Sequence, residues 1–176
     1  RNFYLIEKDK RFISYLNEKF KEKVNVINED ILTYDLKKLD DSNFIVFGNL
    51  PYNVSSQILT KFINYNPKNF MYKKLVFMFQ KEVADRILAQ ENTKNYGRLS
   101  IFSSWKLNIK KIMDIDPSSF HPKPKVTSSL LVFEPKLNFI ELKNSKNLEH
   151  ITNVFFNQRR KMIKKPLNII FKNSKK

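Results

Sequence analysis

The sequence predicts an α/β protein with a doubly wound sheet. Short apolar runs alternate with segments whose apolar residues recur at helical spacing, and polar or turn residues follow several of the runs. Alternating strands and helices favour a parallel sheet, which binds ligands beyond the carboxyl ends of its strands. A chain of 176 residues, of which 41% are hydrophobic and 16 are Phe, can also bury a sizeable core.

The predicted elements follow one another along most of the chain. Strands are expected at 3–6, 24–27, 44–47, 75–79, 109–115 and 128–133, and helices at 12–20, 54–63, 80–90 and 99–107. Only the proline-rich connection 117–126 separates the last two strands, so we expect one of them to be antiparallel. A final basic helical segment should be interrupted at Pro166. We therefore expect a sheet domain at 1–142 and the start of a small helical domain at 143–176.

A net charge of +16 and a pI near 9.9 favour a nucleic-acid partner. Each Lys or Arg near a phosphate releases condensed counterions, which makes basic proteins bind nucleic acids. Five candidates for phosphate contacts are Lys123, Lys125, Arg159, Arg160 and Lys161. Nucleotide bias in the genome would also enrich Lys and Asn, and basic runs are commonly just solvated faces, so charge alone leaves the partner open.

Several function classes are excluded by residues that are rare or missing. The sequence has no Cys and only two His, so we expect no disulfide, no cysteine nucleophile and no metal. No apolar stretch approaches the ~20 residues of a membrane span, and no signal peptide is visible. We therefore expect a monomeric cytoplasmic protein without a membrane partner.

The segment Asn-Leu-Pro-Tyr after the third predicted strand could position an aromatic amine for methyl transfer. Such an amine is a poor nucleophile, because its lone pair is delocalised into the ring. The side-chain oxygen of Asn49 and the carbonyl of Leu50 can accept the two amino hydrogens, in a turn stiffened by Pro51. The ring of Tyr52 can stack on the base. Gly48, Asn49 and Pro51 would equally make an ordinary strand-to-helix turn, and the segment alone leaves both interpretations open.

Four segments together point to a known family. In chain order they are Phe44-Ile-Val-Phe-Gly-Asn-Leu-Pro-Tyr-Asn-Val-Ser-Ser, then Gln80-Lys-Glu-Val-Ala-Asp-Arg with Tyr96-Gly-Arg-Leu-Ser, then Ser119-Phe-His-Pro-Lys-Pro-Lys-Val-Thr-Ser, and last Phe156-Asn-Gln-Arg-Arg-Lys. They resemble the ribosomal RNA adenine dimethyltransferases of the kasugamycin-resistance type over nearly the whole chain. The resemblance implies a Rossmann-like methyltransferase domain that uses S-adenosylmethionine. It also implies N6-dimethylation of adenines in small-subunit ribosomal RNA, within a pre-ribosomal subunit, as a step of ribosome biogenesis.

The resemblance also implies roles for single residues. The residues implied to bind the cofactor are Glu7, Lys8, Asp30, Ile31 and Asn49. Those implied to contact the target adenine are Asn49, Leu50, Pro51, Tyr52 and Phe120. Glu7 would bind the ribose hydroxyls and Asp30 the cofactor's adenine amino group, whereas Phe120 would face Tyr52 across the target base. Apart from the family, Glu7 could be a solvated acid, Asp30 an Asx turn or helix cap, and Phe120 a plug at the core's edge.

One feature of the family is missing from this sequence. The family begins with a strand and a glycine-rich loop that approaches the methionine part of the cofactor, whereas this chain has only Gly48 and Gly97. The helical domain is also shorter than in the family. We expect the 176-residue chain to be a part of a longer protein and to be inactive by itself.

Two other functions compete with small-subunit methylation. A large-subunit enzyme of the erythromycin-resistance type shares the fold and the late motif, but typically carries Ile where this chain has Leu50. A noncatalytic ribosome-assembly or transcription factor on the same fold would keep the basic surface, yet would not need Asn49, Tyr52 and Phe120 together. A DNA adenine methyltransferase ranks lower, since its motif usually reads Pro-Pro where Leu50 and Pro51 stand here.

Overall fold

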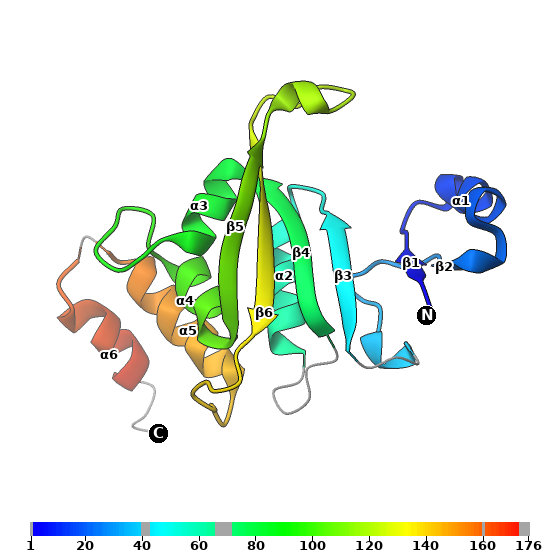
Figure 1. Ribbon diagram of the computed structural model, residues 1–176. Coiled ribbons are helices and arrows are strands. Elements are labelled where there is room, and N and C mark those ends of the chain that lie inside the picture. Colours follow the sequence, from blue (N-terminus) through cyan, green and yellow to red (C-terminus); the bar gives the residue numbers. More distant parts are fainter. Residues whose placement is uncertain (1, 40–42, 66–71, 160, 173–176) are drawn as a thin grey trace. The chain divides into compact units, whose positions relative to one another are not determined.

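A computed structural model describes residues 2–39, 43–65, 72–159 and 161–172 of the chain (Figure 1). The chain forms two compact units, Arg1–Phe44 and Ile45–Lys176, called the first and the second unit below. Within the described residues, every helix is too short or too polar to cross a lipid bilayer.

The first unit holds a pair of parallel strands. Strand β1 (Tyr4–Ile6) pairs with β2 (Asn25–Ile27), and helix α1 (Ile13–Phe20) connects them. Both strands and the helix agree with the sequence prediction to within a residue or two. Parallel pairing places the carboxyl ends of both strands at the same edge, where the chain continues into Glu7 and Asn28.

The second unit is built on a four-stranded sheet in the order β3-β4-β6-β5. The strands are β3 (Phe44–Asn49), β4 (Tyr72–Gln80), β5 (Leu107–Ile115) and β6 (Ser128–Pro135). Strand β6 is antiparallel to both neighbours, with Phe133 opposite Leu75 of β4 and Ile109 of β5. The expected antiparallel strand is therefore the last strand of the chain, and it lies inside the sheet rather than at its edge.

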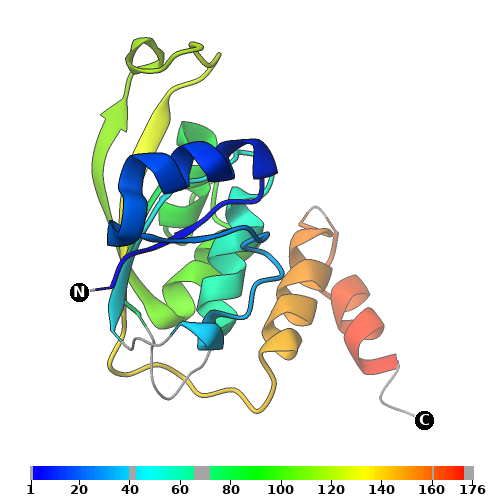
Figure 2. The ribbon, with the colours of Figure 1, turned by 90° about the vertical axis from the view of Figure 1, so that its right-hand side faces the viewer.

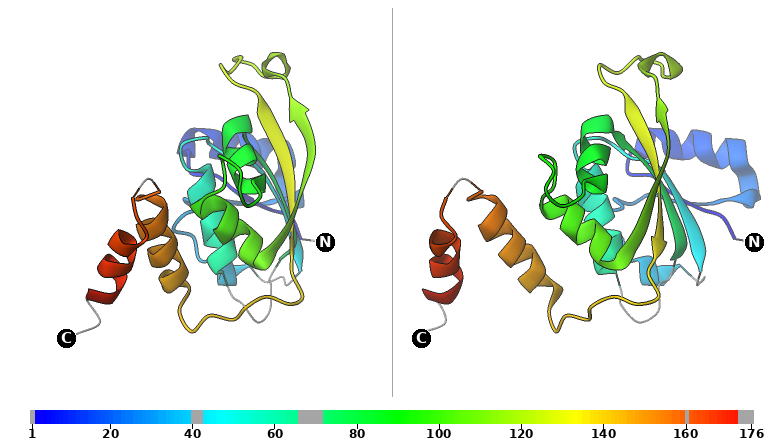
Figure 3. Two further views of the ribbon diagram at one scale, coloured as in Figure 1. Left: turned by 90° about the vertical axis from the view of Figure 1, so that its left-hand side faces the viewer. Right: turned by 60° about the vertical axis from the view of Figure 1, so that its left-hand side comes forward.

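One face of this sheet is covered by helices (Figure 3). They are α2 (Ser55–Asn64), α3 (Lys81–Leu88) and α4 (Arg98–Lys106). An aromatic cluster fills the space between these helices and the sheet, and its members are at most 1% exposed: Phe62, Tyr72, Phe77, Phe79 and Phe133. Neighbouring rings lie 5.6–6.3 Å apart in edge-to-face or tilted arrangements. Burying one Phe contributes roughly 1.5–3 kcal/mol, so this cluster anchors the sheet.

The chain after β6 forms two further helices, α5 (Ser145–Phe156) and α6 (Lys164–Lys172), which lie next to each other (Figure 2). The predicted interruption at Pro166 is wrong, because Pro166 lies in the first turn of α6. A proline is tolerated there, since the first backbone N–H groups of a helix have no partner inside it. The proposed domain boundary between residues 142 and 143 stays a prediction.

Candidate active site

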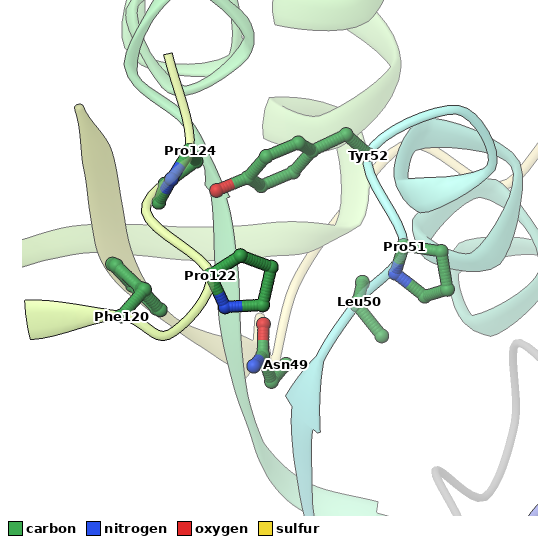
Figure 4. A pocket seen from close by; sticks show the side chains of 7 residues that line it. All are labelled: Asn49, Leu50, Pro51, Tyr52, Phe120, Pro122 and Pro124. Atoms are coloured by element: carbon green, nitrogen blue, oxygen red, sulfur yellow. The ribbon is translucent and has the colours of Figure 1, made fainter. Parts of the chain in front are cut away.

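The Asn-Leu-Pro-Tyr segment lines a cavity of about 280 Å³ in the second unit (Figure 4). The lining residues are Asn49, Leu50, Pro51, Tyr52, Phe120, Pro122 and Pro124. They come from the end of β3 and from the connection between β5 and β6. All five residues assigned to the target adenine therefore lie in one pocket, although Tyr52 and Phe120 are 68 positions apart in the sequence.

The first wall of this pocket is fixed by the way β3 ends. Alternation along the strand exposes Asn49 and turns Gly48 toward the interior. The amide of Val54 donates to the carbonyl of Pro51 at 3.1 Å, and α2 starts directly afterwards. Ser55, which is 1% exposed, donates its hydroxyl to the carbonyl of Tyr52 at 3.1 Å. The segment is thus the expected strand-to-helix turn, and this turn also borders a cavity.

The second wall is the proline-rich connection, which projects beyond the other strands of the second unit (Figure 1). It begins with the short 3-10 helix Pro117–Ser119, which Asp116 caps by accepting a hydrogen bond from the amide of Ser118. Phe120 follows and is half-buried, so it does not belong to the buried core. Pro122 and Pro124 complete the wall, and no role for either of them was predicted from the sequence.

Ser128, which no sequence signal singled out, holds Tyr52 in place. The hydroxyl of Tyr52 is hydrogen-bonded to Oγ of Ser128 at 2.8 Å, and Ser128 is completely buried at the start of β6. The sequence alone does not indicate that Ser128 contacts Tyr52, because the two residues are 76 positions apart.

A charged group joins strands β5 and β6 next to the connection between them. Asp114 of β5 accepts hydrogen bonds from Ser129 of β6 at 2.6 Å and from Lys111 at 2.9 Å. Lys81 of α3 lies 3.6 Å from the same carboxylate. The bond from Ser129, followed by that from Lys111, lowers the pKa of Asp114 from 3.8 to about 2. The strands that carry the second wall are thereby joined to each other and to α3.

Four of the five residues assigned to the cofactor lie in the first unit, whereas Asn49 lies in the second. Asp30 accepts from the amide of Leu32 at 2.9 Å and pairs with Lys8 at 2.8 Å. Glu7 accepts from the amide of Asp9 at 2.7 Å. The side-chain amide of Asn28 donates to the carbonyls of Glu7 and Lys8 at 2.9 and 3.2 Å and so links the ends of both strands. Asp30 makes the Asx turn that the sequence allowed, and Ile31 next to it is partly exposed.

Of the basic candidates within the described residues, Arg159 contacts two neighbouring residues. Its guanidinium lies 5.5 Å from the ring centroid of Phe156 and donates to the carbonyl of Lys94 at 3.2 Å. A second cavity of about 380 Å³ is lined by Phe156, Asn157, Gln158, Arg159 and Lys161. Lys123 and Lys125 are exposed beside Phe120. Arg160 lies outside the described residues.

Strands and helices alternate along the chain, one antiparallel strand is inserted into the sheet, and an Asn-Leu-Pro-Tyr turn follows the carboxyl end of a strand. These features define a Rossmann-like methyltransferase. The model of the ribosomal RNA adenine dimethylase family matches residues 1–176, so the chain belongs to this family. S-adenosylmethionine is the cofactor that the family uses.

Curated relatives agree with the family. The chain is 55% identical over 175 residues to the ribosomal RNA small subunit methyltransferase A of Pelagibacter ubique (strain HTCC1062), covering 99% of the chain and 67% of the relative. It is 42% identical over 179 residues to the protein of the same name from Prochlorococcus marinus (strain AS9601), covering 98% and 65%. The chain thus spans about two thirds of the length of these relatives.

Solved structures with the same fold include two transferases. A dimethyladenosine transferase from Plasmodium falciparum superposes with a TM-score of 0.77 at 28% identity, over 97% of this chain and 59% of that one. The 23S rRNA methyltransferase ErmE superposes with a TM-score of 0.67 at 21% identity, over 95% and 66%. At 21% identity, the likeness to ErmE concerns the fold alone.

Proposed function

We propose that this chain contributes the adenine-binding site and part of the cofactor site of an enzyme that dimethylates adenines at N6 in small-subunit ribosomal RNA. The observation that carries the proposal is the pocket, which combines Asn49 and Leu50 with the rings of Tyr52 and Phe120. The names of the curated relatives support the small subunit as the target. The name of the Plasmodium enzyme, a dimethyladenosine transferase, supports adenine as the base that is modified.

Asn49 and Leu50 act on the amino group of the adenine. The side-chain oxygen of Asn49 and the carbonyl of Leu50 accept its two hydrogens, which draws the lone pair out of conjugation and directs it outward. S-adenosylmethionine, when bound, supplies a methyl group on a positively charged sulfur. The proton that the nitrogen loses afterwards goes to water, so the neighbouring His121 is not needed as a base.

Tyr52 and Phe120 hold the plane of the base. A flipped adenine placed between two aromatic rings gains about 1–3 kcal/mol per stacked base, which offsets the cost of leaving the RNA helix. The pocket is open to solvent at Asn49, so a base can enter without rearrangement of the aromatic core.

The residues assigned to the cofactor suit its polar groups. The ribose diol and the adenine amino group are hydrogen-bond donors, and Glu7 and Asp30 offer carboxylate oxygens at the ends of two parallel strands. The link made by Asn28 supports both assignments, because it keeps the two strand ends together. Lys8 already pairs with Asp30 and thus orients that carboxylate.

The basic residues bind the RNA backbone in this proposal. Arg159, Arg160 and Lys161 follow α5, whereas Lys123 and Lys125 flank the pocket and would contact the phosphates next to the flipped base. The partner is small-subunit RNA in a pre-ribosomal particle, bound by a monomeric enzyme in the cytoplasm. That the 176-residue chain is inactive by itself stays a prediction.

Methyl-transfer assays with the complete protein test this function. Labelled S-adenosylmethionine is offered with isolated small subunits, large subunits or DNA, and an Asn49→Ala variant serves as the control. Label in dimethyladenosine of small-subunit RNA, absent with the variant, is the expected result. Label in large-subunit RNA would favour the erythromycin-resistance type. RNA binding without any labelled acceptor would favour a noncatalytic assembly factor.

A further inference from the structure

Tyr52 is held at both of its ends. Its backbone carbonyl accepts a hydrogen bond from the buried hydroxyl of Ser55 at 3.1 Å, and its phenolic oxygen is hydrogen-bonded to Ser128 at 2.8 Å. A phenolic hydroxyl next to buried groups usually has a hydrogen-bond partner, and here that partner is a buried residue of the sheet. The bond to Ser128 fixes the direction of the ring.

Ser128 is itself a rigid point of the sheet. It is 0% exposed, and as the first residue of β6 it lies opposite Gln80 of β4 and Ile115 of β5. It also follows Phe120 by only eight residues, at the end of the connection that forms the second wall. The hydroxyl of Ser128 therefore joins Tyr52, in the first wall, to the strand that follows the second wall.

We propose that Ser128 is a positioning residue for methyl transfer, which fixes the ring of Tyr52 and is needed most for the second methyl group. The proposal rests on the function proposed above. Unmodified adenine has two amino hydrogens, and Asn49 and Leu50 can each accept one of them. N6-methyladenine has only one amino hydrogen left, so stacking between the two aromatic rings must contribute more to the orientation of the base. A loosely held Tyr52 ring therefore slows the second methyl transfer more than the first.

The test compares Ser128→Ala with the wild type in the complete protein. The readout is the ratio of monomethyladenosine to dimethyladenosine in small-subunit RNA at equal total methyl incorporation, together with the rate of each step. We expect the second step to slow by roughly tenfold, equivalent to the loss of one hydrogen bond's positioning, and the first step to slow much less. A variant that merely contains less folded enzyme would not change this ratio at equal incorporation.

Two further variants make the test specific. Tyr52→Phe keeps the ring but removes the other partner of the bond, so it should raise the monomethyl fraction as Ser128→Ala does, and combining both changes should add no further effect. Ser100→Ala is the matched control. Its buried hydroxyl donates to the carbonyl of Arg86 at 2.6 Å outside the pocket, so it should cost stability without changing the ratio.

The outcomes separate this inference from the proposed function. An unchanged product ratio in Ser128→Ala, with a wild type that dimethylates normally, overturns the role of Ser128 alone. Additive effects of Ser128→Ala and Tyr52→Phe overturn it too, because the two residues would then act independently. A wild type that methylates no small-subunit adenine overturns both.

Discussion

Gly48 occupies a position where β3 has no room for a side chain. A Cβ atom there would lie 2.6 Å from Leu50 and 3.0 Å from the ring of Phe77. We expect Gly48→Ala to lower the free energy of unfolding by roughly 1–3 kcal/mol, because the added Cβ atom would overpack the buried ring of Phe77. Denaturant unfolding measures this effect. Gly97→Ala is the control, since its nearest neighbours lie at 3.8 Å or more; equal losses in both variants would contradict the steric explanation.

Asn49 is exposed at the end of β3, so its side chain contributes little to folding. We expect Asn49→Ala to reduce methyl transfer by about 10²–10³-fold, the cost of losing one aligned hydrogen-bonding group in an active site. Thermal unfolding and RNA binding should stay as in the wild type. Asn53→Ala, which changes an exposed asparagine of the same turn outside the pocket lining, should keep its activity. An active Asn49→Ala enzyme would remove the basis of the proposed chemistry.

Among single residues, the sequence predicted candidates by their chemical groups and missed residues that only their contacts single out. Asn49, Tyr52 and Phe120 could be proposed because amide and aromatic groups suit an adenine, and the structure brings them to one pocket. Ser128 could not, because its role depends on a contact across the sheet. Lys106 illustrates the same limit. It is 2% exposed and donates to the carbonyl of Ile63 at 3.1 Å, whereas a lysine is ordinarily expected in solvent.

At the scale of elements, the stability that Asp114 gives to the β5–β6 pair next to the connection should depend on pH. The pKa of Asp114 lies at about 2 in the folded protein, below its usual 3.8, so the unfolded chain binds more protons between these values. The stabilisation is therefore present above about pH 4 and is lost as the pH falls through the folded value. Thermal unfolding of the wild type and of Asp114→Asn should differ at pH 5 and converge toward pH 2.

A second carboxylate variant controls for the loss of one charge. Glu91→Gln changes an exposed residue in the loop before α4, away from the hairpin. Its unfolding temperature should follow that of the wild type through the same pH range. A constant difference between Asp114→Asn and the wild type at every pH would mean that the ionisation of Asp114 does not account for its effect.

The types and order of the elements were predicted well, but the position of Pro166 inside a helix was not. Buried apolar runs and helical periodicity are local signals, so strands such as β4 and helices such as α2 are read directly from them. Whether a proline ends a helix or opens one depends on where the helix starts, and the flanking lysines of α6 give no capping signal. The position of β6 inside the sheet depends on pairing between distant strands, which periodicity does not encode.

For the whole molecule, the charge of +16 predicts RNA binding that weakens steeply with salt. We expect Arg159→Ala to lower the affinity for RNA fragments and to reduce the slope of log K against log salt by about 1, the share of one phosphate contact. Lys74→Ala is the matched control, because Lys74 already pairs with Glu134 at 2.8 Å. Identical slopes for wild type and Arg159→Ala would exclude Arg159 from the RNA contact.

The packing of α5 has a practical consequence for solubility. Asn153 of α5 accepts a hydrogen bond from Arg98 at 2.9 Å, Glu149 accepts one from Asn64 at 3.1 Å, and the ring of Phe156 meets that of Tyr96 edge-on at 6.2 Å. A protein shortened to residues 1–142 would lose these partners and uncover apolar surface on α4. Exposed patches of this kind promote aggregation, so versions made for crystallisation or expression should retain α5 even where only the adenine pocket is of interest.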